Sequence, residues 1–239
     1  MNLHNLLLAT AASVTAFPAL ADVNIYTTRQ PELIQPVMDA FTDKTGINVN
    51  LNFVNDALIE QLKAEGARSP ADLVMTVDIA NMQRVVDSGT IQAVESDVLQ
   101  EAVPANLRAA DNTWFALTTR ARIVYASKER VADGEITTYN DLADPKWKGR
   151  ICTRSGLHNY NLALLSAYIA HNGEDEAKIW AQALKDNLAV KPQGGDREQV
   201  KSIWAGECDI SLGNTYYMGQ MVADPEQSEW ANSVSIRFP

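Results

Sequence analysis

The chain has 239 residues, of which 46% are hydrophobic and 21% are charged, and its formal net charge is −10 at pH 7. This length allows one large domain or two smaller ones with a sizeable core, and the composition excludes a disordered chain. The acidic balance argues against a nucleic-acid-binding protein, because phosphate binding requires basic patches.

The first 21 residues have the pattern of a secretory signal peptide. Residues 6–12 form an apolar core, and residues 19–21 form a small-x-small cleavage site before Asp22. A buried first helix is the alternative, which the helix-breaking Pro18 disfavours. No later stretch is apolar and long enough to span a bilayer. We therefore expect a mature protein that begins near Asp22 and lies outside the cytoplasm.

Strand and helix signals alternate in the first half of the mature chain. Short β-branched or apolar runs predict strands, and apolar residues three or four positions apart predict helices. The expected strands are residues 23–28, 47–54 and 71–77, and the expected helices are residues 31–46, 56–66 and 79–89. Such alternation predicts a mostly parallel sheet with helices on both faces.

A second α/β unit follows a strand-like run at residues 120–126. Its expected strands are residues 150–155, 188–193 and 208–213, its expected helices are residues 161–173, 174–187 and 196–207, and residues 137–149 are an expected turn region. We therefore predict a two-lobed α/β protein with a ligand cleft between the lobes. Residues 22–122 would form the N-lobe and residues 123–239 the C-lobe.

Cys152 and Cys208 are the only two cysteines, and each has a strand-like context. In an oxidising compartment a disulfide between them is the first expectation. Metal ligation ranks well below, because two cysteines alone make a poor metal site.

Tyrosines occur where expected strands give way to helices. Tyr26 ends the first expected strand, Tyr160 lies at a helix entry with Asn159 or Asn161 as the expected cap, and Tyr216 and Tyr217 follow the strand at residues 208–213, where Asn214 or Thr215 is the expected cap. Ligands of open α/β sheets bind beyond the carboxyl ends of strands. The partial positive charge of a helix N-terminus also stabilises anions, such as a phenolate.

Phenolates are hard oxygen donors. Because the ordinary tyrosine pKa is roughly 10, ligation at neutral pH requires a strong Lewis acid. Fe(III) fits this requirement, whereas Ca²⁺ and Mg²⁺ prefer carboxylates and water, and zinc prefers His and Cys. The alternative is a packing role with a solvated hydroxyl, which is favoured for Tyr26 and Tyr125. For Tyr216 and Tyr217 both interpretations stay open, since adjacent rings cannot enter one core from one strand.

A set of segments carries a resemblance that extends from about Val23 to the end of the chain: VNIYTTR, AFTDKTGINVN, EGARSPADLVMTVDIANM, LTTRARIVYASKERV, TYNDLADPKWKGRI, RSGLHNYN and GNTYYMG. Together they resemble the periplasmic ferric-iron-binding proteins of bacterial ABC importers. The resemblance implies a hinged, monomeric periplasmic protein that closes on Fe(III) and delivers it to an inner-membrane permease. The family's C-lobe tyrosine ligands correspond to Tyr160, Tyr216 and Tyr217.

The sequence departs from this family at the first strand-to-helix turn. Many relatives have Arg-His-Tyr-Asn there, with His and Tyr as N-lobe ligands, whereas residues 29–32 read Arg-Gln-Pro-Glu. Pro31 cannot ligate iron, and Gln30 is a poor donor for it. Family members with few protein ligands use an anion such as carbonate or bicarbonate. Arg29 and Arg120 are the candidates to hold it, because a guanidinium matches a planar oxyanion, with a surface ion pair as the alternative for each.

A second departure is length, because relatives continue beyond this point and return to the first lobe. Residues 233–239 would be the start of that return crossover. We therefore expect either a fragment that lacks the C-terminal part, or an N-lobe without some of its relatives' elements. Without an anion, Glu32 or Asp78 would be the next N-lobe candidate.

Two other classes of function remain. A binding protein of the same fold for a small oxyanion or organic anion would use Arg29, Arg120 and the helix N-termini, with the tyrosines as hydrogen-bonding groups. An enzyme is disfavoured, because the sequence has no nucleophile elbow, metalloprotease motif or phosphate loop. His158, near Tyr160, is a candidate general base, although a lone loop histidine is more often solvated.

Overall fold

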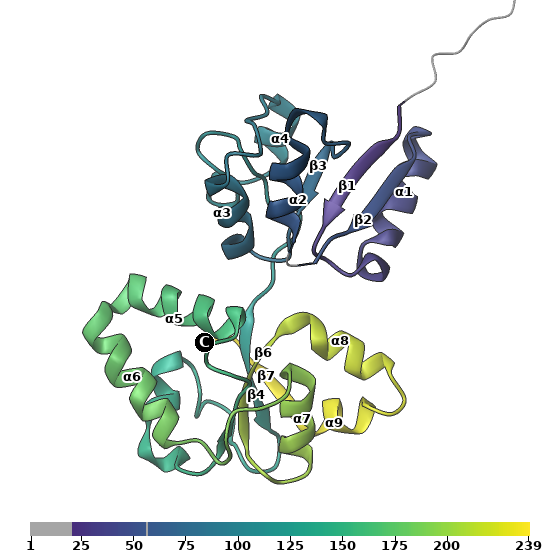
Figure 1. Ribbon diagram of the computed structural model, residues 1–239. Helices are drawn as coiled ribbons and strands as arrows, with labels where there is room; N and C mark the ends of the chain where they lie inside the picture. The colour runs from purple at the N-terminus through teal and green to yellow at the C-terminus, as the bar shows by residue number, and fades with distance from the viewer. Residues whose placement is uncertain (1–20, 56) are drawn as a thin grey trace, which may run out of the picture. The chain divides into compact units, whose positions relative to one another are not determined.

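The computed structural model describes residues 21–55 and 57–239, and the chain forms two compact units, Met1–Phe115 and Ala116–Pro239 (Figure 1). The expected signal peptide lies outside the described residues except for Ala21. The second unit begins at Ala116, whereas the sequence placed the boundary after residue 122. Arg120 therefore belongs to the second unit.

The first unit is built on a parallel sheet with the strand order β2-β1-β3. Its strands are β1 (Val23–Thr27), β2 (Val49–Phe53) and β3 (Leu73–Met75), and its helices are α1 (Gln35–Thr45), α2 (Leu58–Glu65), α3 (Ile79–Asp87) and α4 (Asp97–Ala102). The expected helix at residues 31–46 opens with a 3-10 turn, Pro31–Leu33, and ends at Gly46 with a φ of 73°. A small core of Tyr26, Leu58, Leu62 and Val85 holds this unit together.

The second unit contains a mixed sheet with the strand order β5-β6-β4-β7. Its strands are β4 (Arg122–Ser127), β5 (Ile151–Cys152), β6 (Ile210–Asn214) and β7 (Val234–Arg237). The β5–β6 pair is parallel, and β4 runs antiparallel to both β6 and β7. The α/β class is therefore confirmed, but the expectation of mostly parallel sheets is wrong for this second sheet, in which β4 makes antiparallel pairs on both of its sides.

Helices cover both faces of this second sheet. They are α5 (Asn159–Asn172), α6 (Glu174–Asp186), α7 (Asp196–Trp204), α8 (Thr215–Ala223) and α9 (Ser228–Ser233). Successive residues of a strand point to opposite faces, so Val124 and Ala126 pack with α5 and α6, and Ile123 and Tyr125 pack with α7, α8 and α9. Figure 1 shows these two helical groups on opposite sides of β4 and β6.

Two strand expectations for the second unit need correction, whereas the expected turn region at residues 137–149 is present. Residues 188–193 form no strand, and only Leu188 makes an isolated bridge, with Ile151. Pro192 lacks the N–H that a strand ladder needs. The strand expected at residues 150–155 shrinks to the two residues of β5. The turn region contains two 3-10 turns, Tyr139–Ala143 and Pro145–Trp147, which bury Trp147.

The last residues pair within the second sheet. Residues 233–239, expected to begin a crossover, contain β7, which pairs antiparallel with β4 at the sheet edge. None of the helices in residues 21–55 and 57–239 has the length and apolar character needed to cross a membrane.

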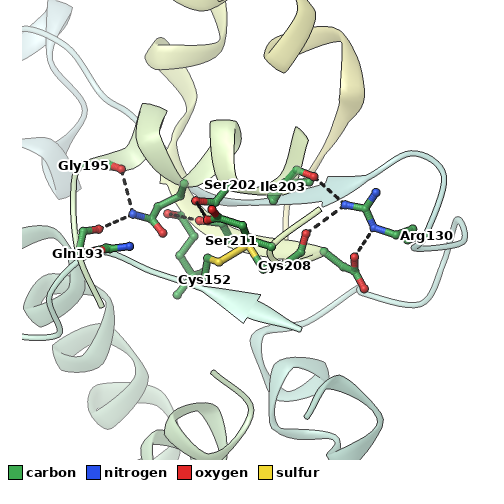
Figure 2. The surroundings of a disulfide bond; sticks show 12 residues. Arg130, Cys152, Gln193, Gly195, Ser202, Ile203, Cys208 and Ser211 are labelled. Carbon is green, nitrogen blue, oxygen red and sulfur yellow. Dashed lines mark hydrogen bonds and ion pairs between the residues drawn. A yellow bond between two sulfur atoms is a disulfide. The ribbon is translucent and has the colours of Figure 1, made fainter. Parts of the chain in front are cut away.

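Cys152 and Cys208 form the predicted disulfide (Figure 2). Their Cα atoms are 5.8 Å apart, and both side chains are buried in the core shared with α7. Cys152 ends β5, and Cys208 lies just before β6. The bond therefore ties together the two parallel strands that lead towards Tyr160 and Tyr216.

Candidate functional site

Tyr160, Tyr216 and Tyr217 come together in the second unit. Tyr160 is the second residue of α5, and the other two lie in the first turn of α8. These helices follow β5 and β6, which are parallel neighbours, so the carboxyl ends of both strands meet at one edge. The hydroxyl oxygens of Tyr160 and Tyr216 are 3.2 Å apart, and the ring centroids of Tyr216 and Tyr217 are 4.3 Å apart. We call these three residues the tyrosine cluster.

The cap of α5 differs from the expectation. His158, rather than Asn159 or Asn161, occupies the N-cap position, and its Nδ1 accepts a hydrogen bond from the Tyr160 backbone N–H at 3.1 Å. The Asn161 amide instead donates to the Thr153 hydroxyl and to the carbonyls of two residues in the same turn. His158 therefore helps to set the direction of the Tyr160 turn, which argues against a role as a general base.

The cap of α8 also serves the cluster. Asn214 is the N-cap residue, as expected, but its side-chain amide makes no cap hydrogen bond and lies 3.3 Å from the Tyr216 hydroxyl, to which it donates. Beneath it, the buried Tyr125 hydroxyl donates to the Asn214 carbonyl at 2.8 Å. A Cβ at Gly213 would lie 2.1 Å from the Tyr125 ring, so only glycine allows this packing. These contacts fix the point at which β6 becomes α8.

Burial raises the pKa of two tyrosines of the cluster, Tyr160 and Tyr217. It raises the pKa of Tyr160 to about 12, and the hydrogen bond shared with Tyr216 adds to this, whereas Arg120 and Arg154 oppose it. Burial, followed by a hydrogen bond with Tyr216, raises the pKa of Tyr217 well above its ordinary value. Since the pKa of each is raised, Tyr160 and Tyr217 are neutral phenols at pH 7.

A buried carboxylate lies beneath the cluster. The side chain of Asp196, the first residue of α7, is fully buried and accepts from Arg122 at 2.5 Å and from Arg154 at 3.2 Å. It also accepts from the backbone N–H of Asn214 at 2.9 Å. Sequence reasoning missed this group, because an Asp at a helix start resembles an ordinary cap residue.

Three guanidinium groups surround the Tyr160 ring. The Cζ atoms of Arg120, Arg122 and Arg154 lie 4.8, 5.8 and 5.1 Å from its centroid. The Nε–H groups of Arg122 and Arg154 are buried and have no acceptor within residues 21–55 and 57–239. With one carboxylate among three guanidinium groups, the surroundings are positive, which suits phenolates or a bound anion.

The three candidate residues of the first unit, Arg29, Glu32 and Asp78, are distant in sequence from the tyrosine cluster. The Arg29 backbone N–H donates to the Thr27 hydroxyl at 2.9 Å, and the side chain is partly exposed. The carboxylate of Asp78 caps α3 through the Asn81 N–H at 2.8 Å. The side chain of Glu32 lies outside the described part of the structure.

Tyr26 has a structural role, and the usual metal-binding side chains form no second candidate site in the described part of the chain. The Tyr26 hydroxyl donates to the Glu65 carboxylate at 3.0 Å within the core of the first unit, as the packing interpretation expects. In the described part of the chain, no group of three or more His, Cys, Asp and Glu side chains is placed to hold a metal ion.

Comparisons with known proteins find similarity to bacterial solute-binding proteins and to an iron uptake protein. The sequence profile of the bacterial extracellular solute-binding proteins matches residues 25–234. Iron uptake protein A1 of Synechocystis sp. is 41% identical over 221 residues, which are 91% of this chain and 61% of that protein. The chain therefore spans less than two thirds of that relative's length.

Two solved structures share the fold. Ferric iron-binding protein A of Mannheimia haemolytica, in an open conformation, aligns with a TM-score of 0.86 and 46% identity over 92% of this chain and 70% of that one. A Trichodesmium protein, IdiA or FutA, in complex with iron and citrate, aligns with a TM-score of 0.86 and 40% identity over 92% and 70% of the two chains.

Proposed function

The chain belongs to the bacterial extracellular solute-binding protein family, and from this premise we propose that it is the Fe(III)-binding component of an ABC importer. Tyr160, Tyr216 and Tyr217 would be the direct protein ligands. The protein would act in the periplasm after signal-peptide cleavage, as a monomer, and would deliver iron to a membrane permease. It would bind its cargo rather than act as an enzyme.

The observation that carries this proposal is the convergence of three phenol groups at one sheet edge. Two of the hydroxyl oxygens are 3.2 Å apart, and the third ring packs against its neighbour in the chain. Deprotonated, the three groups would supply three hard oxygen donors and three negative charges, which together neutralise Fe(III). The named relatives, an iron uptake protein and ferric iron-binding proteins, support the same cargo.

The ligand assignment is tested by Tyr160→Phe, Tyr216→Phe and Tyr217→Phe. Each change removes one donor oxygen and keeps the ring that packs in the cluster. In titrations with ferric nitrilotriacetate, each variant should lose affinity by more than the roughly 10- to 100-fold typical of residues behind the ligands. The visible phenolate-to-iron band should also shift or fade, while circular dichroism shows a folded protein.

Tyr168→Phe is the matched control. Tyr168 lies on the same helix as Tyr160 and is buried, but its hydroxyl donates to Asn140 and its ring stacks on Trp180, away from the cluster. This variant should bind iron like the parent. If all three cluster variants also bind like the parent, the ligand assignment is wrong.

An exogenous anion would complete the iron coordination. Three phenolates leave an octahedral Fe(III) with open positions, and a carbonate or bicarbonate could fill two of them. Arg120, which lies over the Tyr160 ring, and Arg29 are our candidates to hold it. The buried Nε–H groups of Arg122 and Arg154 support an anion near the cluster, as does the citrate of the Trichodesmium complex.

The arginine-rich surroundings also favour a second candidate function. Three guanidinium groups around one ring suit a small oxyanion or organic anion as the cargo, with the neutral tyrosines donating hydrogen bonds. Isothermal titration with citrate and bicarbonate, without iron, distinguishes the two functions. Tight anion binding together with no ferric band would favour the second.

A further inference from the structure

Asp196 connects the elements that carry the tyrosine cluster. Its carboxylate accepts from Arg122, the first residue of β4, and from Arg154, in the turn between β5 and α5. It also accepts from the backbone N–H of Asn214, the last residue of β6. One side chain at the start of α7 thus joins the turns that lead to Tyr160 and to Tyr216.

Arg122 extends this connection to α5. Its second terminal nitrogen donates to the Asn161 side-chain oxygen at 2.8 Å, and Asn161 follows Tyr160 directly. Arg122 also donates to the Asn214 side-chain oxygen at 3.2 Å, two residues before Tyr216. Asp196 therefore holds a guanidinium group that contacts both tyrosine-bearing helix starts.

A second carboxylate between two arginines lies at the other end of β6, although its side chain is 12% exposed, whereas that of Asp196 is fully buried. Asp209, just before that strand, pairs with Arg130 and Arg150, and both guanidinium groups also donate to backbone carbonyls. Figure 2 shows Arg130 directed at the carbonyls of Ile203 and Cys208. Among the residues that the structure describes, Asp196 thus forms an ion triad beside the tyrosine cluster, and Asp209 forms one away from it.

The negative charge of Asp196 is what holds Arg122 and Arg154 in place. A buried carboxylate between two guanidinium groups holds them in place through charge and hydrogen bonds together. Without that carboxylate, Arg122 and Arg154 would repel each other beneath the Tyr160 ring, and the Asn214 N–H would lose a charged acceptor. The turns that carry Tyr160 and Tyr216–Tyr217 would then lose the contacts that hold them together, and their phenol groups would no longer have fixed positions.

We propose that Asp196 is a positioning residue for Fe(III) binding, which holds the Tyr160 and Tyr216–Tyr217 turns in their binding arrangement through Arg122, Arg154 and the Asn214 N–H. This inference rests on the proposed function, because it requires the tyrosines to be ligands. It assigns a functional role to a residue that does not contact the cargo.

The test compares Asp196→Asn with Asp209→Asn. Both changes keep the shape of the side chain and remove one buried charge from between two arginines. Asp196→Asn should weaken Fe(III) binding by about 10- to 100-fold, the usual effect of a group that orients metal ligands, and should alter the phenolate-to-iron band. Asp209→Asn should destabilise the fold but keep the parent's affinity and band.

A measurement on the iron-free protein supplies a second readout. In hydrogen–deuterium exchange, Asp196→Asn should speed exchange in peptides that cover residues 153–161 and 212–217. Asp209→Asn should leave those peptides close to the parent. If Asp196→Asn does not fold, Arg154→Gln removes the longer ion pair and is measured in carbonate-free buffer, so that a lost anion contact of Arg154 does not contribute, with the same expected weakening.

The outcomes separate this inference from the proposed function. If the parent shows no ferric band, the proposed function fails, and the role of Asp196 fails with it. If the parent binds iron and Asp196→Asn binds equally well, only the present inference is overturned. Equal weakening by Asp196→Asn and Asp209→Asn would also overturn it, since the loss would then reflect stability alone.

Discussion

At the scale of the residue, Tyr160 and Tyr217 begin as neutral phenols. Burial raises the pKa of Tyr160 to about 12 and also raises the pKa of Tyr217, whereas a metal ligand must be a phenolate. For these tyrosines to bind iron as we propose, the metal must displace their protons. Its affinity should rise as the pH rises, and mild acid should release it.

Proton release is the direct check of this point. Addition of ferric nitrilotriacetate to excess parent protein at pH 7 in weak buffer should release one proton from each phenol that binds iron, less the protons that the freed nitrilotriacetate and any iron-bound hydroxide take up. A pH indicator measures the release, corrected by the same addition to protein-free buffer. Tyr160→Phe should release about one proton per iron fewer than the parent, because the uptake by the chelator is the same in both, and equal release by parent and variant would contradict ligation by the Tyr160 phenolate.

The residues behind the cluster were out of reach for sequence reasoning. The tyrosines were predicted through the resemblance of short segments, which needs only local sequence. Arg122 and Asp196, in contrast, are 74 residues apart, and Arg154 and Asp196 are 42 apart. Only the sheet order brings these charges together, so no local pattern could reveal the pairing. The contact between Gly213 and the Tyr125 ring was missed for the same reason.

At the scale of the element, the prediction succeeded where periodicity is strong. The alternation along β4 places its side chains in two different cores, and the helices on both faces follow from it. The prediction failed at residues 188–193, where apolar residues precede Pro192 and the chain leaves the sheet after one bridge. Where a strand ends and whether a short segment joins the sheet depend on tertiary contacts, which a local sequence pattern does not contain.

At the scale of the element, the disulfide between Cys152 and Cys208 joins β5 to the start of β6. Its two cysteines are 56 residues apart, and in the chain-entropy model such a loop gives up to about 4 kcal/mol of stability. The double variant Cys152→Ala/Cys208→Ala should therefore lose a large part of that amount in urea unfolding. Ser211→Ala, a buried change in the adjacent strand, should cost only about 1 kcal/mol. Equal unfolding free energies for parent and double variant would contradict the prediction.

At the scale of the whole molecule, the two arginine candidates belong to different units, with Arg29 in the first and Arg120 in the second. Iron affinity should rise when bicarbonate is added to carbonate-free buffer, because the anion fills open coordination positions. Arg120→Ala should reduce this gain, since Arg120 lies over the Tyr160 ring. The same measurement on Arg29→Ala reports the contribution of the first unit.

Citrate and an inert anion serve as the comparison arms of that titration. Citrate tests whether a larger carboxylate replaces carbonate, and chloride controls for ionic strength. If bicarbonate, citrate and other small anions all leave the affinity and the visible band unchanged, the anion has no role. Glu32 and Asp78 would then be the next residues to substitute.

The central claim is that Fe(III) is held by the phenol oxygens of Tyr160, Tyr216 and Tyr217. Crystals of the protein grown with ferric nitrilotriacetate, measured on both sides of the iron absorption edge, test this most directly. We expect an anomalous peak at the carboxyl ends of β5 and β6, within bonding distance of all three phenol oxygens. A peak elsewhere, or an iron-loaded protein whose metal contacts none of these tyrosines, would contradict it.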